Sequence, residues 1–287
     1  LLKTGRDEYG AVLPLNLKSF GDYKPGLYVY FTIPFVALLG LNEWAVRLPS
    51  ALLGIATVYL VFLLSQKLFN SRAVSLLASL MLAISPWHLH FSRGGWETNA
   101  ATFGIVLGVW AWLKALENSK WWWVSGGAFL ASMYLYQSPR LVVPVLILGF
   151  AIYHWRRLWS TKKQLIWPII GLGLLTIPLA SQFIFGGGTA RFNGLSFTSD
   201  LGPKSRLEEL RGEHQSENGL LAKLLHNKVT AYGPAFLEHY LDHFDSQFLF
   251  INGEEVIRHR VPETGQFYLL NAIWLIAGII FLSRSNI

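Results

Sequence analysis

Three acidic side chains have the residue type and the surroundings to do chemistry. The chain contains 17 Asp and Glu, of which 11 lie between residues 186 and 266. The remaining six are Asp7, Glu8, Asp22, Glu43, Glu97 and Glu117. A carboxylate can accept the proton of an attacking hydroxyl group, so we treat Asp7, Glu8 and Glu97 as candidate catalytic residues. The alternatives are a solvated surface pair for Asp7-Glu8 and a helix N-terminal charge for Glu97.

Cationic side chains accompany these acids along the chain. Lys24 follows Tyr23, Arg93 precedes Glu97 in a glycine-containing turn, and Arg140 follows Pro139. Lys and Arg neutralise phosphate oxygens through charge-assisted hydrogen bonds. Acids and cations together suit the transfer of a group from a lipid-linked phosphate donor. We therefore predict that Lys24, Arg93 and Arg140 bind the phosphate of such a donor. Lys24 could instead be an interfacial lysine, and Arg140 could anchor a helix end.

The composition indicates a membrane protein. Hydrophobic residues make up 52% of the chain and charged residues 14%, whereas soluble domains carry about 25% charged residues. This balance argues against a soluble enzyme, a disordered chain, collagen and a coiled coil. The net charge of +7 is then a signal of membrane orientation rather than of nucleic-acid binding. Cysteine is absent, which excludes disulfides and thiolate metal sites.

Seven apolar stretches approach the roughly 20 residues that a transmembrane helix requires. They are 48–69, 73–91, 100–117, 121–137, 140–158, 165–185 and 267–283. A shorter run, 26–41, contains Pro34 and aromatic residues, which favours a helix lying flat at the interface. The predicted domains are 1–47 (outer loop with the flat helix), 48–185 (six spans), 186–266 (outer loop) and 267–283 (a further span).

Basic residues set the predicted orientation. Arg156, Arg157, Lys162 and Lys163 form the densest basic cluster near span ends, so we place it in the cytoplasm. Counting outward from there puts 1–47 and 186–266 on the outer face, together with every acid outside that loop except Glu117. We expect a multi-pass protein of a bacterial or archaeal cell membrane with an outward-facing site.

The outer loop 186–266 carries further polar patterns. Leucines at helical spacing predict an amphipathic helix over 219–232 that ends before Pro234, and 206–211 favours a short helix. His239, Asp242, His243 and Asp245 share a helix face and could ligate a metal, as could His88 and His90. A solvated or interfacial helix face explains the first group better, and an interfacial histidine pair explains the second. We therefore predict no metal and no cofactor.

Three segments of the N-terminal half resemble the first outer loop of polyprenyl-phosphate-dependent glycosyltransferases. They are Arg6-Asp7-Glu8-Tyr9, Tyr23-Lys24-Pro25-Gly26-Leu27-Tyr28 and Asn42-Glu43-Trp44-Ala45-Val46-Arg47-Leu48-Pro49-Ser50. This group includes protein O-mannosyltransferases and lipid A aminoarabinose transferases, of the glycosyltransferase family 39 type. Gly26 replaces the usual second proline, and Glu97 after Trp96 replaces an Asp after Pro.

The resemblance implies an all-α integral membrane bundle of the GT-C type with outer juxtamembrane helices. It implies Asp7 as general base, Glu8 as its partner and Lys24 as a phosphate contact. Arg93 and Glu97 match the family's second outer turn, and Arg140 is a looser match for a phosphate contact. It also implies further spans before and after this chain, so we expect both ends to lie within a longer protein.

The predicted function is transfer of a sugar, hexosyl or pentosyl in class, from a polyprenyl-phosphate donor to a hydroxyl-bearing protein, lipid or glycan, with inversion. The expected partners are that donor, the acceptor and membrane lipids, with no nucleic acid. The alternatives are a transporter or lipid flippase, and a non-catalytic scaffold. Mid-span charges would favour a transporter, whereas Asp7 and Glu97 in one shared pocket would favour an enzyme.

Overall fold

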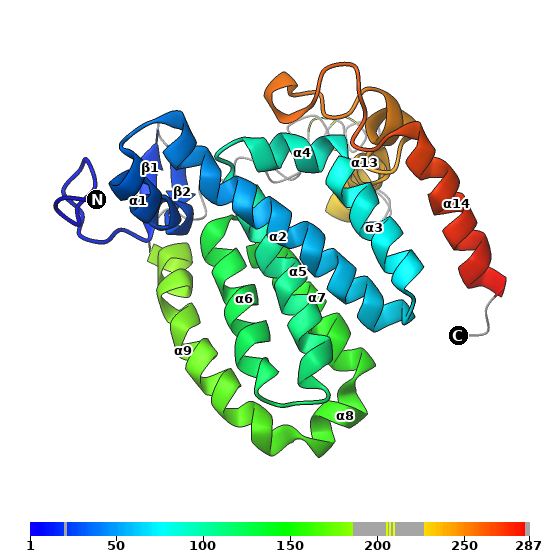
Figure 1. Cartoon of the computed structure of the whole chain (residues 1–287), viewed down its shortest axis with the longest axis horizontal. Helices are drawn as coiled ribbons and strands as arrows, with labels where there is room; N and C mark the ends of the chain where they lie inside the picture. The colour runs from blue at the N-terminus through cyan, green and yellow to red at the C-terminus, as the bar shows by residue number, and fades with distance from the viewer. Residues whose placement is uncertain (20–21, 186–204, 206, 208, 210–226, 285–287) are drawn as a thin grey trace.

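The computed structural model describes residues 1–19, 22–185, 205, 207, 209 and 227–284. Its helices form a bundle, with a small hairpin near the N-terminus (Figure 1). The elements are β1 (Asn16–Ser19), β2 (Asp22–Pro25), α1 (Leu27–Leu39), α2 (Glu43–Phe69), α3 (Arg72–Ile84), α4 (Pro86–Arg93), α5 (Glu97–Ala115), α6 (Trp121–Leu135), α7 (Pro139–Tyr153), α8 (Trp155–Ser160), α9 (Lys162–Phe185), α13 (Lys228–Asp242), the π-helical turn η2 (Gln247–Ile251), the 3-10 turn η3 (Ile257–His259) and α14 (Leu269–Arg284). The prediction of an all-α membrane bundle is confirmed.

Side-chain caps explain the ends of the long helix α2. Asn42 Oδ1 accepts a hydrogen bond from the Ala45 backbone N–H at 3.0 Å and starts the helix. Asn70 ends it in the left-handed conformation, with φ of 48°, a region that Asn tolerates better than most residues. Ser71 then caps α3, so α2 and α3 are joined by a tight turn.

The predicted span 73–91 is broken. α3 and α4 meet at an angle of 59°, and the break falls at Ser85-Pro86. Proline has no backbone N–H and disfavours helical geometry in the residue before it, so the chain changes direction and restarts a helix. The bend carries α4 across the end of the bundle where α2 and α5 begin (Figure 1).

Small residues let the central helices α2, α5 and α6 approach closely. A Cβ on Gly108 of α5 would lie 2.5 Å from the Phe129 ring of α6, and Ser125 of α6 donates a hydrogen bond to the Gly108 carbonyl at 2.9 Å. On the other side, Asn99 of α5 donates to the Ser50 carbonyl of α2 at 2.8 Å. Close packing at small residues with interhelical hydrogen bonds is typical of helices in membranes.

Length and composition distinguish the helices that could cross a bilayer. Among the described residues, Glu43–Phe69 and Lys162–Ser181 qualify, and the bent pair α3 and α4 would make a third. α6 and α7 each have 15 residues and α14 has 16, fewer than the roughly 20 that a perpendicular crossing requires. The predicted span 140–158 is also interrupted, because α7 ends at Tyr153 and α8 begins at Trp155. The seven-span division remains a prediction.

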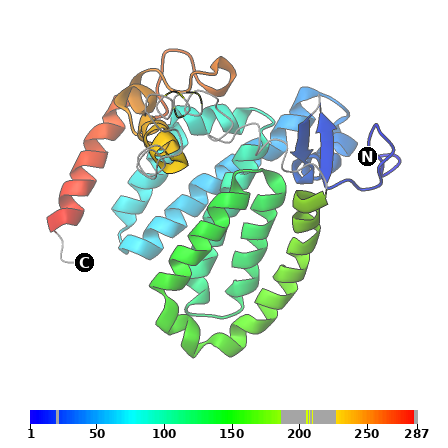
Figure 2. The ribbon, with the colours of Figure 1, turned by 180° about the vertical axis from the view of Figure 1, so that it is seen from behind.

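Two local features differ from the sequence-based expectation. The antiparallel hairpin of β1 and β2, with Leu17 opposite Lys24, was not expected. Its position beside the ends of α6 and α9 is visible from behind (Figure 2). In the outer loop, α13 does not end before Pro234 but continues to Asp242. Its start is fixed by reciprocal capping between Asn227 and Thr230, which offsets the one backbone hydrogen bond that the proline removes.

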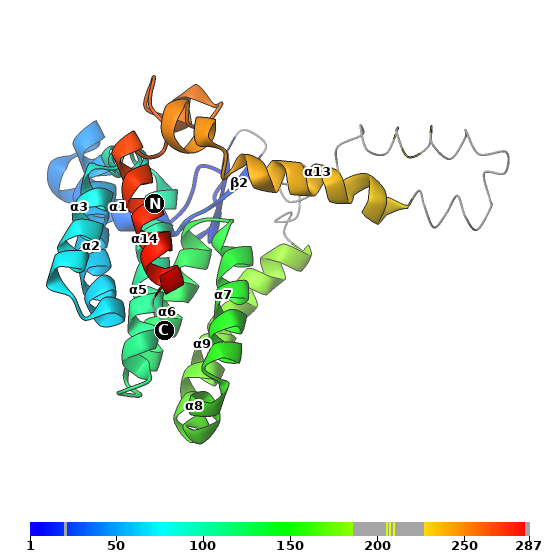
Figure 3. The same ribbon diagram turned by 90° about the vertical axis from the view of Figure 1, so that its right-hand side faces the viewer.

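Other expectations in the outer loop fall outside the described residues. These are most of the amphipathic helix at 219–232 and most of the short helix at 206–211. The described helix α13 points away from the bundle (Figure 3), whereas α14 runs alongside it.

Candidate active site

Four of the six predicted site residues line a single cavity. Asp7, Glu8, Lys24 and Glu97 belong to the wall of a hollow of about 660 Å³. The N-terminal loop supplies the adjacent acids, β2 supplies Lys24, and the start of α5 supplies Glu97. The cavity therefore collects side chains that are up to 90 positions apart in the sequence.

Asp7 holds the N-terminal loop in shape. Its Oδ1 accepts hydrogen bonds from the backbone N–H groups of Tyr9 at 3.0 Å and Ala11 at 2.8 Å. A backbone bond from Asp7 N–H to the Ala11 carbonyl at 3.0 Å closes the same turn. Because both side-chain bonds use Oδ1, Oδ2 can still receive a proton.

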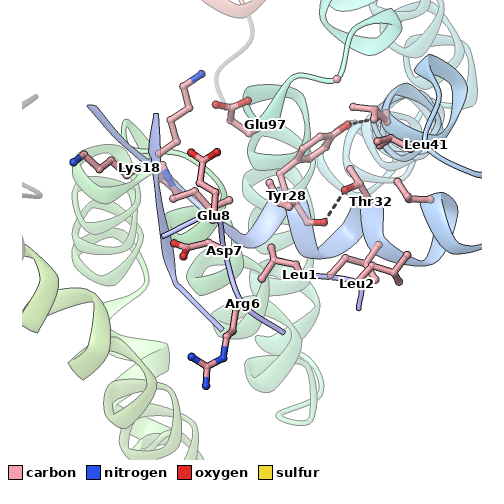
Figure 4. Close-up of a pocket in the computed structure, with 18 of the residues that line it drawn as sticks. Leu1, Leu2, Arg6, Asp7, Glu8, Lys18, Tyr28, Thr32, Leu41 and Glu97 are labelled. Carbon is pink, nitrogen blue, oxygen red and sulfur yellow. Dashed lines mark hydrogen bonds between the residues drawn. The ribbon is translucent and has the colours of Figure 1, made fainter. Parts of the chain in front are cut away.

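Glu8 and Glu97 approach the cavity from different elements. Figure 4 shows both carboxylates pointing into the same space, whereas Arg6 points away from it. Glu8 is exposed and Glu97 is half-buried. Glu97 is the first residue of α5, where the helix dipole stabilises a negative charge. Its position is compatible both with that structural role and with a role in the cavity.

Lys24 brings a positive charge to these acids. It is exposed on β2. Two further cations, Arg6 and Lys18, also line the cavity and were not singled out as candidates from the sequence. Lys18 lies over the ring of Tyr9, with Nζ 5.2 Å from its centroid. The hairpin that positions Lys18 was signalled only by Gly21 between two short polar-apolar alternations.

Tyr28 forms a buried part of the wall. It is 5% exposed, and its hydroxyl donates to the Val46 carbonyl of α2 at 3.0 Å. Burial, with a further contribution from the charge of Glu97, raises the pKa of Tyr28 to about 12. The phenol therefore stays protonated at neutral pH and fixes α1 to the start of α2 as a hydrogen-bond donor.

The other two predicted phosphate contacts lie outside the lining of this cavity. Arg93 is exposed at the end of α4. Arg140, at the start of α7, is half-buried and donates from Nε to the Met133 carbonyl at 3.1 Å. In this structure, then, Lys24 is the predicted phosphate ligand that shares the cavity with the acids.

An apolar wall completes the cavity. Val29, Ile33 and Val36 of α1 line it, and their spacing puts them on one helix face. The cavity thus has charged groups in one part and aliphatic side chains in another. Such a cavity suits an amphipathic molecule that carries an ionic group attached to a hydrocarbon chain.

The histidine groups weighed from the sequence do not form a metal site in the described part of the chain. No group of three His, Cys, Asp or Glu there is arranged to hold a metal ion. His239 Nδ1 lies 3.7 Å from Asp242 Oδ2, and His243 Nδ1 lies 2.7 Å from the His239 carbonyl. His88 Nε2 instead lies 3.2 Å from the Gly54 carbonyl, inside the helix packing.

Comparison with known proteins identifies a family that covers more than half of the chain. The dolichyl-phosphate-mannose-protein mannosyltransferase family matches residues 23–181. That range contains Lys24, Arg93, Glu97 and Arg140, whereas Asp7 and Glu8 lie before it. No solved structure matches the chain.

Two curated proteins of Bacillus subtilis (strain 168), named as putative mannosyltransferases, are similar to part of the chain. YycA is 26% identical over 159 residues, which are 53% of this chain and 22% of YycA. YkcB is 25% identical over 155 residues, which are 54% of this chain and 21% of YkcB. The matched stretch thus spans about a fifth of the length of each relative.

Proposed function

This chain belongs to the dolichyl-phosphate-mannose-protein mannosyltransferase family, and from that premise we propose that it transfers a sugar from a polyprenyl-phosphate donor to an acceptor hydroxyl. The family is one of membrane glycosyltransferases; the activity of this chain, its donor, its acceptor, the outward-facing site and the stereochemistry are our proposal. The observation that carries the proposal is the shared cavity of Asp7, Glu8, Lys24 and Glu97.

In the proposed reaction, Asp7 is the general base. The acceptor oxygen attacks the anomeric carbon of the donor sugar while the bond between that carbon and the phosphate oxygen breaks. The acceptor proton passes to Oδ2 of Asp7, and polyprenyl phosphate leaves with the bonding electrons. A single direct displacement inverts the anomeric configuration. Glu8 would orient the acceptor, and Glu97 would stabilise positive charge on the sugar ring in the transition state.

Lys24 is proposed to neutralise the leaving phosphate. Charge-assisted contacts to phosphate oxygens strengthen as negative charge develops on the leaving group. Lys18 is a second lysine in the lining of the same hollow, whereas the Arg6 guanidinium points away from it (Figure 4). The aliphatic wall made by Val29, Ile33 and Val36 is suited to the first isoprene units of the donor's tail.

A transfer assay tests this function. The purified protein in lipid nanodiscs would receive polyprenyl-phosphate mannose labelled in the sugar, with candidate hydroxyl acceptors. We expect labelled product together with released polyprenyl phosphate, and NMR of the product should show an anomeric configuration opposite to that of the donor. Retained configuration would reject direct displacement. Donor that stays intact with every polyprenyl-phosphate sugar supplied would reject the function.

A further inference from the structure

A second hollow adjoins the carboxylate cavity. It has a volume of about 570 Å³. Its wall is made of Leu41, Asn42, Glu43, Val46, Arg47, Gly94, Gly95 and Trp96. Leu41, Val46 and Gly95 also line the carboxylate cavity, so a molecule in the second hollow would lie next to the acids. We call this second hollow the Trp96 groove.

The indole of Trp96 is held in a fixed position within the groove. His90, Phe91 and His259 surround it, with ring centroids 6.4, 5.7 and 5.6 Å from the Trp96 ring. Gly94 permits this placement, because a Cβ there would lie 2.3 Å from the indole. Trp96 nevertheless stays half-buried rather than buried. A rigid aromatic surface of this kind offers contact area at little cost in conformational entropy.

Polar groups stand at another side of the same groove. Arg47 and Glu43 form an ion pair of 3.1 Å in which the two side chains remain 55% and 78% exposed. Together they present hydrogen-bond donors and acceptors to one ligand. Asn42 is different, since its amide accepts from Ala45 N–H and donates to the Leu39 carbonyl. Its polar atoms are therefore committed to the helix cap.

We infer that the Trp96 groove binds a sugar ring of the acceptor, an inference that rests on the proposed function. A pyranose ring has apolar C–H faces that pack on an aromatic surface and a rim of hydroxyl groups that both donate and accept. The groove supplies the aromatic surface through Trp96 and the paired donors and acceptors through Arg47 and Glu43. A peptide that binds by strand addition would need an open strand edge, and the described lining of the groove has none, because it is built from the first turn of α2 and the turn at Gly94-Gly95.

The proposal gives Trp96 a role in specificity rather than in the chemical step. Glu97 follows Trp96 directly and lines the neighbouring cavity, so a sugar seated on the indole would direct one of its hydroxyl groups towards the acids. The acceptor of this enzyme is then a carbohydrate, either free or attached to a lipid or a larger glycan.

Saturation-transfer NMR on the purified protein in nanodiscs tests the inference without any donor present. The probes are methyl α-D-mannopyranoside and, separately, a neutral serine-containing tetrapeptide. We expect saturation of the mannoside by the unmodified protein. Trp96→Ala should weaken mannoside binding about tenfold, the upper end of what an aromatic contact contributes. Trp44→Ala is the matched control, because Trp44 is 78% exposed beside the groove and does not line it.

A second variant protects the test against misfolding. Glu43→Gln removes a charge from an exposed ion pair, which contributes little to stability, and it should also weaken mannoside binding while the helical circular dichroism is retained. Unchanged mannoside binding in both Trp96→Ala and Glu43→Gln, or saturation of the tetrapeptide but not of the mannoside, would overturn the inference. Mannoside binding through Trp96 in a protein that transfers no sugar would instead reject only the proposed function.

Discussion

At the scale of single residues, Asp7 has a structural role in the N-terminal loop and a proposed catalytic role as the general base. Its Oδ1 holds the turn from Tyr9 to Ala11 through two backbone N–H groups. The same carboxylate lines the cavity that contains Glu97. A substitution at position 7 can therefore disturb the loop conformation, the proposed proton transfer or both. The replacement residue decides which of these two effects an experiment measures.

Asp7→Asn and Asp7→Ala should separate these effects. Asparagine keeps an Oδ1 acceptor, whereas alanine leaves the two N–H groups without their partner, at a cost of about 1–3 kcal/mol if they stay desolvated. We expect faster amide hydrogen exchange at Tyr9 and Ala11 in Asp7→Ala only. Equal exchange in the two variants would mean that the side chain does not hold this turn.

Lys24 and Arg93 make a matched pair for the phosphate site. Lys24 lines the cavity and Arg93 does not, although both were predicted to contact phosphate. We expect Lys24→Ala to weaken binding of the polyprenyl-phosphate donor about 10- to 100-fold, since it removes a charge-assisted contact of roughly 1.5–3 kcal/mol. Arg93→Ala should change donor affinity by less than about threefold. Titration of each variant with fluorescent polyprenyl phosphate measures the two affinities. A larger loss of affinity in Arg93→Ala than in Lys24→Ala would show that the phosphate does not bind beside β2.

At the scale of elements, glycines decide how closely the helices approach. Gly108 faces the Phe129 ring of α6 without room for a methyl group, whereas a Cβ on Gly127 would meet no atom within 4 Å. The two positions therefore separate the effect of crowding from the effect of removing a glycine.

Gly108→Ala should destabilise the protein by about 1–3 kcal/mol through overpacking. Gly127→Ala should be neutral or stabilising by up to about 1 kcal/mol, because alanine favours helix. Unfolding in mixed micelles, followed by circular dichroism, measures the free energies. A destabilised Gly127→Ala beside an unaffected Gly108→Ala would contradict the observed α5–α6 contact.

The sequence predicted the helical runs well and the interruptions poorly. The length of the apolar runs located the helices, because an apolar segment of about twenty residues in a bilayer satisfies its backbone hydrogen bonds by forming a helix. Window averages of hydrophobicity do not register the bend at Ser85-Pro86, which follows from the backbone restrictions of proline, or the break at His154 between α7 and α8. The hairpin of β1 and β2 was missed for a related reason: its four-residue strands are too short for a periodic signal.

The candidate site was predictable in part. The Asp7-Glu8 pair, Lys24 and Glu97 were found from residue type and family resemblance. Lys18 and Tyr28 were not assigned roles, since only the three-dimensional arrangement brings them to the same wall. Trp96 was noted only as the neighbour of Glu97, and its three ring contacts come from α4 and from η3, far apart in the chain.

At the scale of the whole molecule, the elements that line the cavity (the hairpin, α1 and the starts of α2 and α5) lie at one end of the bundle. The turns that follow α2, α5 and α7 lie at the other end (Figure 1). α2 and α5 begin at the cavity, and α6 ends close to it. At the other end, Lys67 pairs with Glu117, and Arg157 Nη2 donates to the Leu116 carbonyl at 3.0 Å. The orientation itself, in which the basic turns face the cytoplasm, stays a prediction.

Labelling of introduced cysteines tests that orientation. The chain has no native cysteine, so single cysteines at positions 10 and 160 report directly on the loop beside the cavity and on the end of α8. In intact cells we expect a membrane-impermeant maleimide to label position 10, and to label position 160 only after the membrane is opened. Labelling of both positions from the same side would refute the topology.

The transfer rate of Asp7→Asn tests the central claim most directly. The variant keeps the loop-forming acceptor and removes the ability to take up a proton, and general-base catalysis is worth about 10²–10⁴-fold. We predict that purified Asp7→Asn binds the polyprenyl-phosphate donor normally and transfers sugar at least about 100-fold more slowly than the unmodified protein. An unchanged transfer rate would exclude Asp7 as the base and contradict the mechanism built on this cavity.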